Sequence, residues 1–133
     1  MTSRLNPYIN FDGTAREALE HYQKVFGGSL DLNTYGDVGG VEGPHMARIM
    51  HGMLETTSGF TIMGADLPPG MEHDPGNDIS MSLSGDDGDE LRRYWNALSE
   101  SGTVTMPLEK QAWGDEFGSC IDRFGVSWMV NIS

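Results

Sequence analysis

The sequence contains a single cysteine, few basic residues and no long apolar run. Because Cys120 has no second cysteine to pair with, an intramolecular disulfide is excluded. Eight Lys and Arg residues stand against twenty Asp and Glu residues, and the formal net charge of -12 repels nucleic-acid phosphates and anionic membrane surfaces. Neither a signal-peptide pattern nor an apolar stretch of membrane-spanning length is visible. We therefore expect a cytoplasmic protein that has neither nucleic acid nor a membrane as a partner.

The sequence does contain an internal repeat. Residues 13–30 have the pattern of a capped helix that runs into a strand, and residues 87–104 repeat this pattern. Three apolar helical positions recur after a spacing of 72, since Leu19, Tyr22 and Phe26 return as Leu91, Tyr94 and Leu98. A slip of two residues then brings Gly102 opposite Gly28. Two half-size copies in 133 residues predict a duplicated module.

The first module is predicted to span about residues 7–66. Alternating polar and apolar residues predict a strand over 7–12. The pattern of a capping box at Thr14 and Glu17 then predicts a helix that Gly27 and Gly28 end. Its apolar stripe consists of Ala15, Ala18, Leu19, Tyr22, Val25 and Phe26. Further strands are predicted at 29–36, 46–55 and 59–65, with a mobile loop over 36–44.

The second module is predicted to span about residues 78–132, after a Pro- and Gly-containing joint at 67–77. Regular alternation predicts its first strand over 78–84. Asp87 and Glu90 repeat the capping box, and Gly102 closes a helix with the apolar stripe Leu91, Tyr94, Trp95 and Leu98. Strands follow at 103–109, 117–122 and 126–132. Each module is therefore β-α-β-β-β, and the predicted fold class is α+β.

Several motifs resemble those of one protein family. They are Pro7-Tyr8-Ile9-Asn10-Phe11-Asp12-Gly13, Tyr22 with Val25-Phe26-Gly27-Gly28, Ile49-Met50-His51, Gly102-Thr103-Val104-Thr105-Met106-Pro107-Leu108, Trp113-Gly114 and Asp122-Arg123-Phe124-Gly125-Val126-Ser127-Trp128. Together with the duplicated βαβββ pattern, they resemble the PhnB-like branch of the vicinal oxygen chelate superfamily. That superfamily contains glyoxalases, bleomycin-resistance proteins, fosfomycin-resistance enzymes and extradiol dioxygenases. The resemblance covers nearly the whole chain.

The resemblance implies a single domain over residues 1–133, in which two modules form a cupped, incompletely closed mixed sheet with helices on its outer face. It also implies a homodimer whose sites lie near the subunit contact. The 67–77 joint permits the modules to pair within one chain or to exchange between two chains. The branch is often labelled by similarity to a demethylubiquinone methyltransferase. No Gly-rich loop follows a strand with an acidic residue beyond it, as a nucleotide-type cofactor fold would need, and we expect no cofactor.

The resemblance also says where a metal would bind. Enzymes of the superfamily hold a divalent metal inside the cup with His or Gln on the first strand of module one, His on the first strand of module two, and Glu on the last strand. The matching places here are near residues 6–8, near residues 78–80 and near Met129, and they do not hold this donor set. A thioether is a poor ligand for hard cations. We therefore expect no metal site of the superfamily type.

The alternation of the strands predicts which side chains line the cup. The apolar positions expected under the helices are Ile9, Phe11, Ile79, Met81, Leu83, Trp128, Val130 and Ile132. The opposite positions, expected in the cavity, are Tyr8, Asn10, Ser80, Ser82, Ser127, Met129 and Asn131, with Trp113 and Tyr8 as aromatic walls. Such a lining suits hydrogen bonding to a small neutral or weakly charged molecule. The alternative is a concavity without a ligand, filled by solvent or covered in the dimer.

His51 is the best candidate for acid–base chemistry, because it lies in a predicted strand with Ile49 and Met53 on its face and imidazole titrates near neutral pH. The alternative is a partly buried histidine with a structural partner. Cys120, in a predicted strand without a neighbouring histidine, is expected to be an inert thiol. Three hypotheses for function follow. The first is a small-molecule-binding protein without the superfamily metal, and the second is a glyoxalase- or dioxygenase-type enzyme that uses His51 and carboxylates such as Glu55 in a rearranged metal site. The third is an interaction module whose cup is empty.

Overall fold

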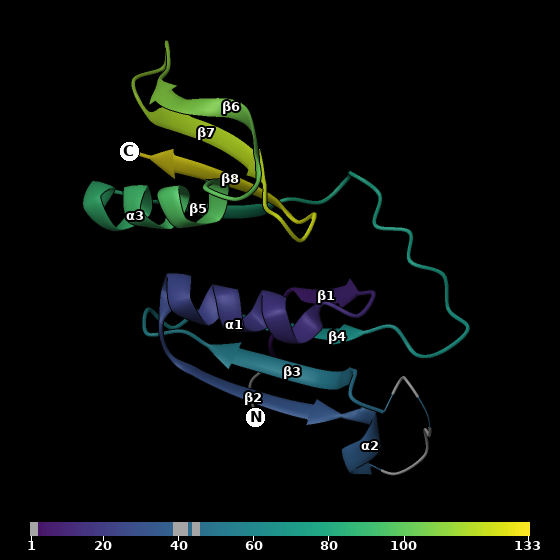
Figure 1. Ribbon diagram of the computed structural model, residues 1–133. Coiled ribbons are helices and arrows are strands. Elements are labelled where there is room, and N and C mark those ends of the chain that lie inside the picture. Colours follow the sequence, from purple (N-terminus) through teal and green to yellow (C-terminus); the bar gives the residue numbers. More distant parts are fainter. Residues whose placement is uncertain (1–2, 39–42, 44–45) are drawn as a thin grey trace. The chain divides into compact units, whose positions relative to one another are not determined.

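The computed structural model describes residues 3–38, 43 and 46–133, and it divides the chain into two compact units, Met1–Pro75 (unit 1) and Gly76–Ser133 (unit 2). Each unit contains one four-stranded mixed sheet and one long helix (Figure 1). The two βαβββ modules predicted from the repeat are therefore confirmed. That both modules belong to one domain stays a prediction. None of the helices in the described part of the chain has the length and hydropathy required to cross a bilayer.

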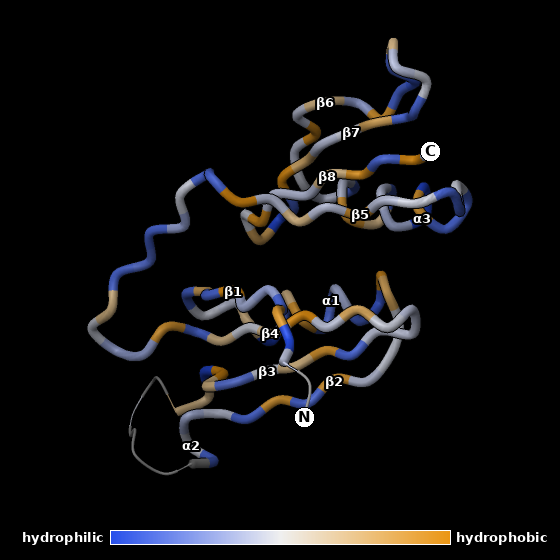
Figure 2. The backbone as a smooth tube through the Cα atoms, turned by 180° about the vertical axis from the view of Figure 1, so that it is seen from behind, coloured by the Kyte–Doolittle hydropathy of each residue, from blue (hydrophilic) through white to orange (hydrophobic). Residues whose placement is uncertain are grey.

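Unit 1 has the strand order β1-β4-β3-β2. Its elements are β1 (Tyr8–Phe11), α1 (Ala15–Phe26), β2 (Ser29–Thr34), α2 (Tyr35–Val38), β3 (Ile49–Glu55) and β4 (Thr61–Asp66). The parallel pair is β1 with β4, whereas β2, β3 and β4 pair antiparallel. Helix α1 packs on one face of this sheet, mainly against β3 (Figure 1). The segment that follows β4 is mostly hydrophilic (Figure 2).

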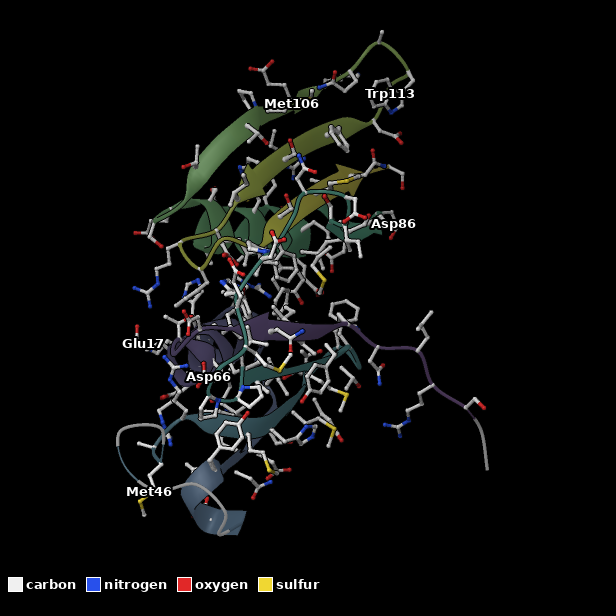
Figure 3. All side chains as sticks on the ribbon, turned by 90° about the vertical axis from the view of Figure 1, so that its right-hand side faces the viewer. Glu17, Met46, Asp66, Asp86, Met106 and Trp113 are labelled. Atoms are coloured by element: carbon white, nitrogen blue, oxygen red, sulfur yellow. The ribbon has the colours of Figure 1, made fainter. Side chains whose placement is uncertain are left out.

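Helix α1 buries the apolar stripe predicted from the sequence, since Ala15, Ala18, Leu19, Tyr22, Val25 and Phe26 are all buried. The predicted capping box is wrong, because Thr14 makes no side-chain capping bond. The buried Asp66 at the end of β4 takes this role, and its Oδ1 accepts hydrogen bonds from the backbone N–H groups of Gly13 (2.8 Å) and Ala15 (3.0 Å). Figure 3 places Asp66 near the first turn of α1, which carries Glu17. A distant strand therefore supplies the anion that the helix N-terminus attracts.

The predicted strand 29–36 ends two residues early, because the chain enters the four-residue helix α2 after Thr34. Thr34 and Asp37 exchange hydrogen bonds: the backbone N–H of Thr34 donates to Asp37 Oδ2, and that of Asp37 donates to Thr34 Oγ1. This reciprocal pair starts a helical turn in the manner of a capping box. The predicted loop 36–44 overlaps α2, and its residues 39–42 and 44 lie outside the described residues.

Strand β3 begins at Ile49 and not at residue 46, and its first residues contain a bulge. Asn33 is paired with His51, but Thr34 is paired with Ile49, so Met50 is an extra residue on β3. The bulge shifts the alternation of the strand. Ile49 is therefore fully buried, while His51 and Met53 are only half-buried, and the prediction that all three share a face is wrong for Ile49.

Unit 2 has the strand order β5-β8-β7-β6, with β5 parallel to β8 and the other pairs antiparallel. Its elements are β5 (Met81–Gly85), α3 (Gly88–Ser99), β6 (Thr103–Lys110), β7 (Glu116–Ile121) and β8 (Ser127–Ile132). Helix α3 buries Leu91, Tyr94, Trp95 and Leu98, as predicted. Asp87 caps α3 by accepting a hydrogen bond from the backbone N–H of Glu90 (3.2 Å). The predicted first half of this capping box is therefore confirmed.

The first strand of unit 2 is shorter than predicted, because β5 begins at Met81 and not at residue 78. Ile79 lies before the strand and is 78% exposed, so its predicted place in the core is wrong. The other apolar positions of the prediction fit better. Leu83, Trp128, Val130 and Ile132 are buried, and Met81 is half-buried.

The repeat is visible in two equivalent glycine contacts. A Cβ on Gly28 would lie 2.0 Å from the backbone oxygen of Glu55, and a Cβ on Gly102 would lie 2.2 Å from that of Ile121. In both units the helix is followed by a glycine that presses against the end of the third strand, where only a hydrogen atom fits. The predicted correspondence of Gly28 and Gly102 is therefore confirmed.

Candidate functional site

Helix α1 leaves one face of the unit 1 sheet uncovered. Residues paired directly on neighbouring strands share a face. The strand register gives a row across all four strands: Tyr8, Met63, Met53 and Asp31. Alternation along each strand extends this surface, which we call the open face of unit 1, to Asn10, Ser29, Asn33, His51, Glu55, Thr61 and Ala65. Gly52 lies on the opposite face, because a Cβ there would lie 2.5 Å from a Leu19 methyl group of α1.

Three of the residues predicted as a site come together on the open face of unit 1. The ring centroids of Tyr8 and His51 are 5.9 Å apart at an interplanar angle of 31°. Asn10, two residues after Tyr8, shares its face and is paired with Ala65. Ala65 is small and only 5% exposed, whereas Tyr8 is 47% exposed. The two rings therefore lie beside each other on the sheet surface, where a ligand can reach them.

Tyr35, at the start of α2, is a neighbour of this pair that the sequence analysis missed. Its hydroxyl donates a 2.8 Å hydrogen bond to the backbone oxygen of Asp66. Burial raises the pKa of Tyr35, and the charges of Asp66 and Tyr8 raise it further, while Arg48 acts in the opposite sense. The phenol therefore stays neutral and keeps its proton for donation. In the sequence, the only signal for the turn that places Tyr35 beside Tyr8 and His51 is the pair Thr34 and Asp37, which caps α2.

The joint segment also contacts this region. His73 Nε2 lies 3.2 Å from the backbone oxygen of Asn10, so the segment after β4 returns to β1 within unit 1. This contact gives His73 a structural partner. His45, in the preceding Gly- and Pro-containing stretch of the sequence, lies outside the described residues.

The corresponding open face of unit 2 carries several hydroxyl groups. The register places Ser82, Met129, Ser119 and Met106 in one row, and Ser84, Asn131 and Phe117 in the next. Thr105 Oγ1 and Ser119 Oγ form a 2.7 Å hydrogen bond across β6 and β7. The predicted site residues Ser82, Met129 and Asn131 therefore share one surface.

Two predicted site residues lie away from these rows. Ser80 is exposed and precedes β5. Trp113 lies in the turn between β6 and β7, where Figure 3 labels it, and it is 64% exposed. Its ring centroid is 6.3 Å from that of Phe117, which belongs to the unit 2 rows. Asp115, from the same turn, accepts a 3.0 Å hydrogen bond from Asn131 Nδ2 and was missed by the sequence analysis.

The donors for a hard metal do not converge in the described part of the chain, where no group of three or more His, Cys, Asp or Glu side chains could hold an ion. Glu55, considered as a partner of His51, is paired instead with Ser29 and Thr61 at the other end of β3. Cys120 is buried, and desolvation together with the charge of Asp122 raises its pKa to about 11. The thiol is therefore protonated at neutral pH and a poor nucleophile.

Unit 2 also has an open hollow of about 520 Å³ beside the N-terminus of α3, and it contains none of the predicted site residues. It is lined by Asp86, Asp87, Gly88, Asp89, Arg92, Lys110, Gly114, Glu116, Ile132 and Ser133. Arg92 pairs there with Glu116 at 2.7 Å. The remaining charged residues of the lining are three aspartates and Lys110.

Comparison with known proteins gives a consistent result. The model of the family described as 3-demethylubiquinone-9 3-methyltransferase matches residues 3–131. Protein YjdN of Escherichia coli is 26% identical over 141 residues, which cover 96% of this chain and 94% of YjdN. The crystal structure of protein PA1353 from Pseudomonas aeruginosa has a TM-score of 0.88 at 37% identity and covers 99% of this chain and 98% of that one.

Two more distant structures share the fold alone. One is a glyoxylase/bleomycin resistance protein/dioxygenase domain from Frankia, with a TM-score of 0.65 at 12% identity, covering 100% of this chain and 93% of that one. The other is a bleomycin-binding protein complexed with bleomycin, with a TM-score of 0.56 at 16% identity and 99% coverage of both chains. The chain therefore belongs to the PhnB-like 3-demethylubiquinone-9 3-methyltransferase family and has the fold of the vicinal oxygen chelate superfamily.

Proposed function

We propose that this protein binds a small organic molecule on the open face of unit 1, and that it does so without a metal of the superfamily type. The observation that carries the proposal is the Tyr8 and His51 ring pair, 5.9 Å apart on a surface that α1 does not cover. Aromatic rings that remain half-exposed beside polar groups are typical of small-molecule sites.

The chemistry of the face suggests the kind of ligand. Tyr8 and His51 offer ring surfaces, Asn10 and Asn33 offer amide donors and acceptors, and Met53 and Met63 offer adaptable apolar surface. The charged residues in these rows are Asp31 and Glu55, and none of the positions that define the face is Lys or Arg. We therefore infer a planar, neutral or weakly cationic ligand, since an anion would meet no opposite charge there.

The bleomycin-binding structure supports the idea that this fold can hold an organic molecule. In our proposal, His51 is a hydrogen-bonding group of the unit 1 site with the capacity for acid–base chemistry. The residues predicted as a site on unit 2 form a separate candidate binding surface of that unit: Ser80, Ser82, Trp113, Met129 and Asn131. A homodimer in the cytoplasm also remains part of the proposal, to be tested by the mass of the protein in solution.

A thermal-shift screen tests the proposal directly. Planar heteroaromatic metabolites, with bleomycin included, are added to the purified protein at high concentration. A ligand present at 100 times its dissociation constant should add about 2.7 kcal/mol to the free energy of unfolding. The compound with the largest shift is then titrated against His51→Ala, Asn10→Ala and the matched control Ser84→Ala on unit 2.

We expect the affinity to fall about tenfold or more in the first two variants and to change little in the control, because each of the two removes a direct contact. Unchanged affinity in both unit 1 variants would remove the proposed site. Metal analysis of protein purified without chelator should detect no stoichiometric Zn, Ni, Mn or Fe. A bound metal that is lost in His51→Ala would favour the enzyme hypothesis instead.

A further inference from the structure

We propose that His51, Met53 and Met63 on the open face of unit 1 form a binding site for a soft monovalent metal ion, Cu(I) or Ag(I). This inference is independent of the organic ligand proposed above. It follows from the pairing of the strands and from the chemistry of thioether and imidazole groups.

The two methionines are opposite each other. Met53 of β3 and Met63 of β4 are direct partners in the antiparallel register. Direct partners have their Cβ atoms about 4.5–5.5 Å apart on the same face. Rotation about the Cα–Cβ and Cβ–Cγ bonds of each methionine moves its sulfur atom, so both sulfur atoms can turn toward one ion between the strands. Both side chains are half-buried, and neither is fixed within the core.

His51 supplies the third donor. It lies two residues before Met53 on β3 and therefore on the same face, about 6.7 Å away along the strand. Its ring leans toward Tyr8, with 5.9 Å between centroids. Because Tyr8 is the register partner of Met63, this direction brings the imidazole toward the methionine pair. One nitrogen and two sulfur donors then approach the same place from two neighbouring strands.

The donor set selects the metal. Thioethers are soft, polarisable ligands that bind Cu(I) well and bind Mg²⁺ or Mn²⁺ poorly, and imidazole suits copper. Because the ligands carry no charge, the neighbouring Asp31, which is paired with Met53, favours a cation electrostatically. A site of this kind is separate from the hard-metal donor set of the superfamily.

Unit 2 provides an internal control. Met129 of β8 is the equivalent of Met63, but its partners are Ser82 and Ser119. The same row contains Met106 of β6, but Met106 is paired with Ser119 and is one strand further away, so no thioether lies directly opposite Met129. The same fold therefore contains one position with the donor set and one position without it.

The test is a titration of protein labelled with ¹³C at the methionine methyl groups, followed by ¹H–¹³C spectra. Ag(I) is used as the probe in chloride-free buffer, in a Cys120→Ala background, so that the thiol does not compete. Met53→Leu and Met63→Leu assign the two resonances, and Met129→Leu is the matched control. Leucine has nearly the same volume as methionine, so these variants should keep the fold, which circular dichroism checks.

We expect the Met53 and Met63 resonances to shift with one equivalent of Ag(I), and Mg²⁺ to shift neither. Affinity should fall about tenfold or more in Met53→Leu, Met63→Leu and His51→Asn, and should stay unchanged in Met129→Leu. If the unit 1 variants keep their affinity, if Met129→Leu loses as much, or if all exposed methionines shift together, the proposal is overturned. If one of the three unit 1 variants does not fold, the affinities of the other two still test the proposal.

Discussion

The two units start their long helices in different ways. In unit 1, the cap of α1 comes from Asp66, which is 51 residues away from Ala15 in sequence and belongs to a different element. In unit 2, the cap of α3 comes from the adjacent Asp87. The position of β8 that corresponds to Asp66 holds an apolar residue, Ile132. A duplicated framework can therefore satisfy the same helix N-terminus through tertiary or through local contacts.

The two open faces differ as well. Across unit 1 the central row reads Tyr8, Met63, Met53 and Asp31. Across unit 2 the equivalent row reads Ser82, Met129, Ser119 and Met106, with Thr105 bonded to Ser119. The backbone contacts of Gly28 and Gly102 repeat, but the surface chemistry does not. In unit 1 the face combines the Tyr8 and His51 rings with two directly opposed methionines, whereas in unit 2 Ser119 lies between Met129 and Met106.

The largest effect is expected at the cap of unit 1. Asp66→Ala removes the acceptor of three backbone N–H groups, those of Gly13, Ala15 and Ile49 (2.9 Å for the last). Each buried donor left without a partner costs about 1–3 kcal/mol, so the free energy of unfolding should fall by about 4 kcal/mol. Asp87→Ala should cost only about 1 kcal/mol. Urea denaturation measures both, and equal losses would contradict the distinction between the two caps.

A smaller effect is expected at Gly28 and Gly102, the two glycines whose close backbone contact is the same in both units. Gly28→Ala and Gly102→Ala should each destabilise the protein by about 2–3 kcal/mol, because the new methyl group would clash with a backbone oxygen. Gly59→Ala is the control, since its φ of 90° is unfavourable for alanine but its surroundings are open. It should cost about 1 kcal/mol. If Gly28→Ala or Gly102→Ala lowered the free energy of unfolding by no more than Gly59→Ala does, the close contact with the backbone oxygen would not contribute to stability.

Cys120 should make the free energy of unfolding depend on pH through the core of unit 2. Cys120 is the last residue but one of β7, and Leu54 has the same position in β3 of unit 1. Its pKa is raised from 9.0 to about 11 in the folded protein, so above pH 9 the unfolded chain loses this proton first. The free energy of unfolding should therefore fall between pH 9 and pH 11, by at most about 3 kcal/mol. The Cys120→Ala variant should not show this fall in the free energy of unfolding. The same pH slope in the variant and in the parent protein would contradict it.

The smallest effect is expected at the surface ion pair of unit 1. Arg48 Nη1 lies 3.0 Å from Asp12 Oδ1, and both side chains are partly exposed. Asp12→Asn should lower the free energy of unfolding by about 0.5 kcal/mol at low salt. The difference should vanish in 1 M NaCl, because the Debye length there is about 3 Å. A loss that persists at high salt would indicate a role beyond the ion pair.

The sequence analysis predicted the elements that depend on local pattern and missed those that depend on distant contacts. Both helical stripes, and the correspondence of Gly28 with Gly102, could be read from periodicity and spacing. The Asp66 cap could not, because nothing in the sequence near Thr14 indicates an acceptor from β4. The bulge before His51 and the position of Tyr35 likewise depend on how β2 pairs with β3. Of the predicted site, Tyr8, Asn10 and His51 come together, while Trp113 lies in a turn.

The most direct test of the account is a titration of ¹⁵N-labelled protein with the compound that gives the largest thermal shift, followed by amide spectra. The account predicts that the resonances of Tyr8, Asn10, His51 and their strand neighbours move first and furthest. Perturbations confined to unit 2, around Ser82 and Ser119, would contradict the assignment of the binding surface to unit 1.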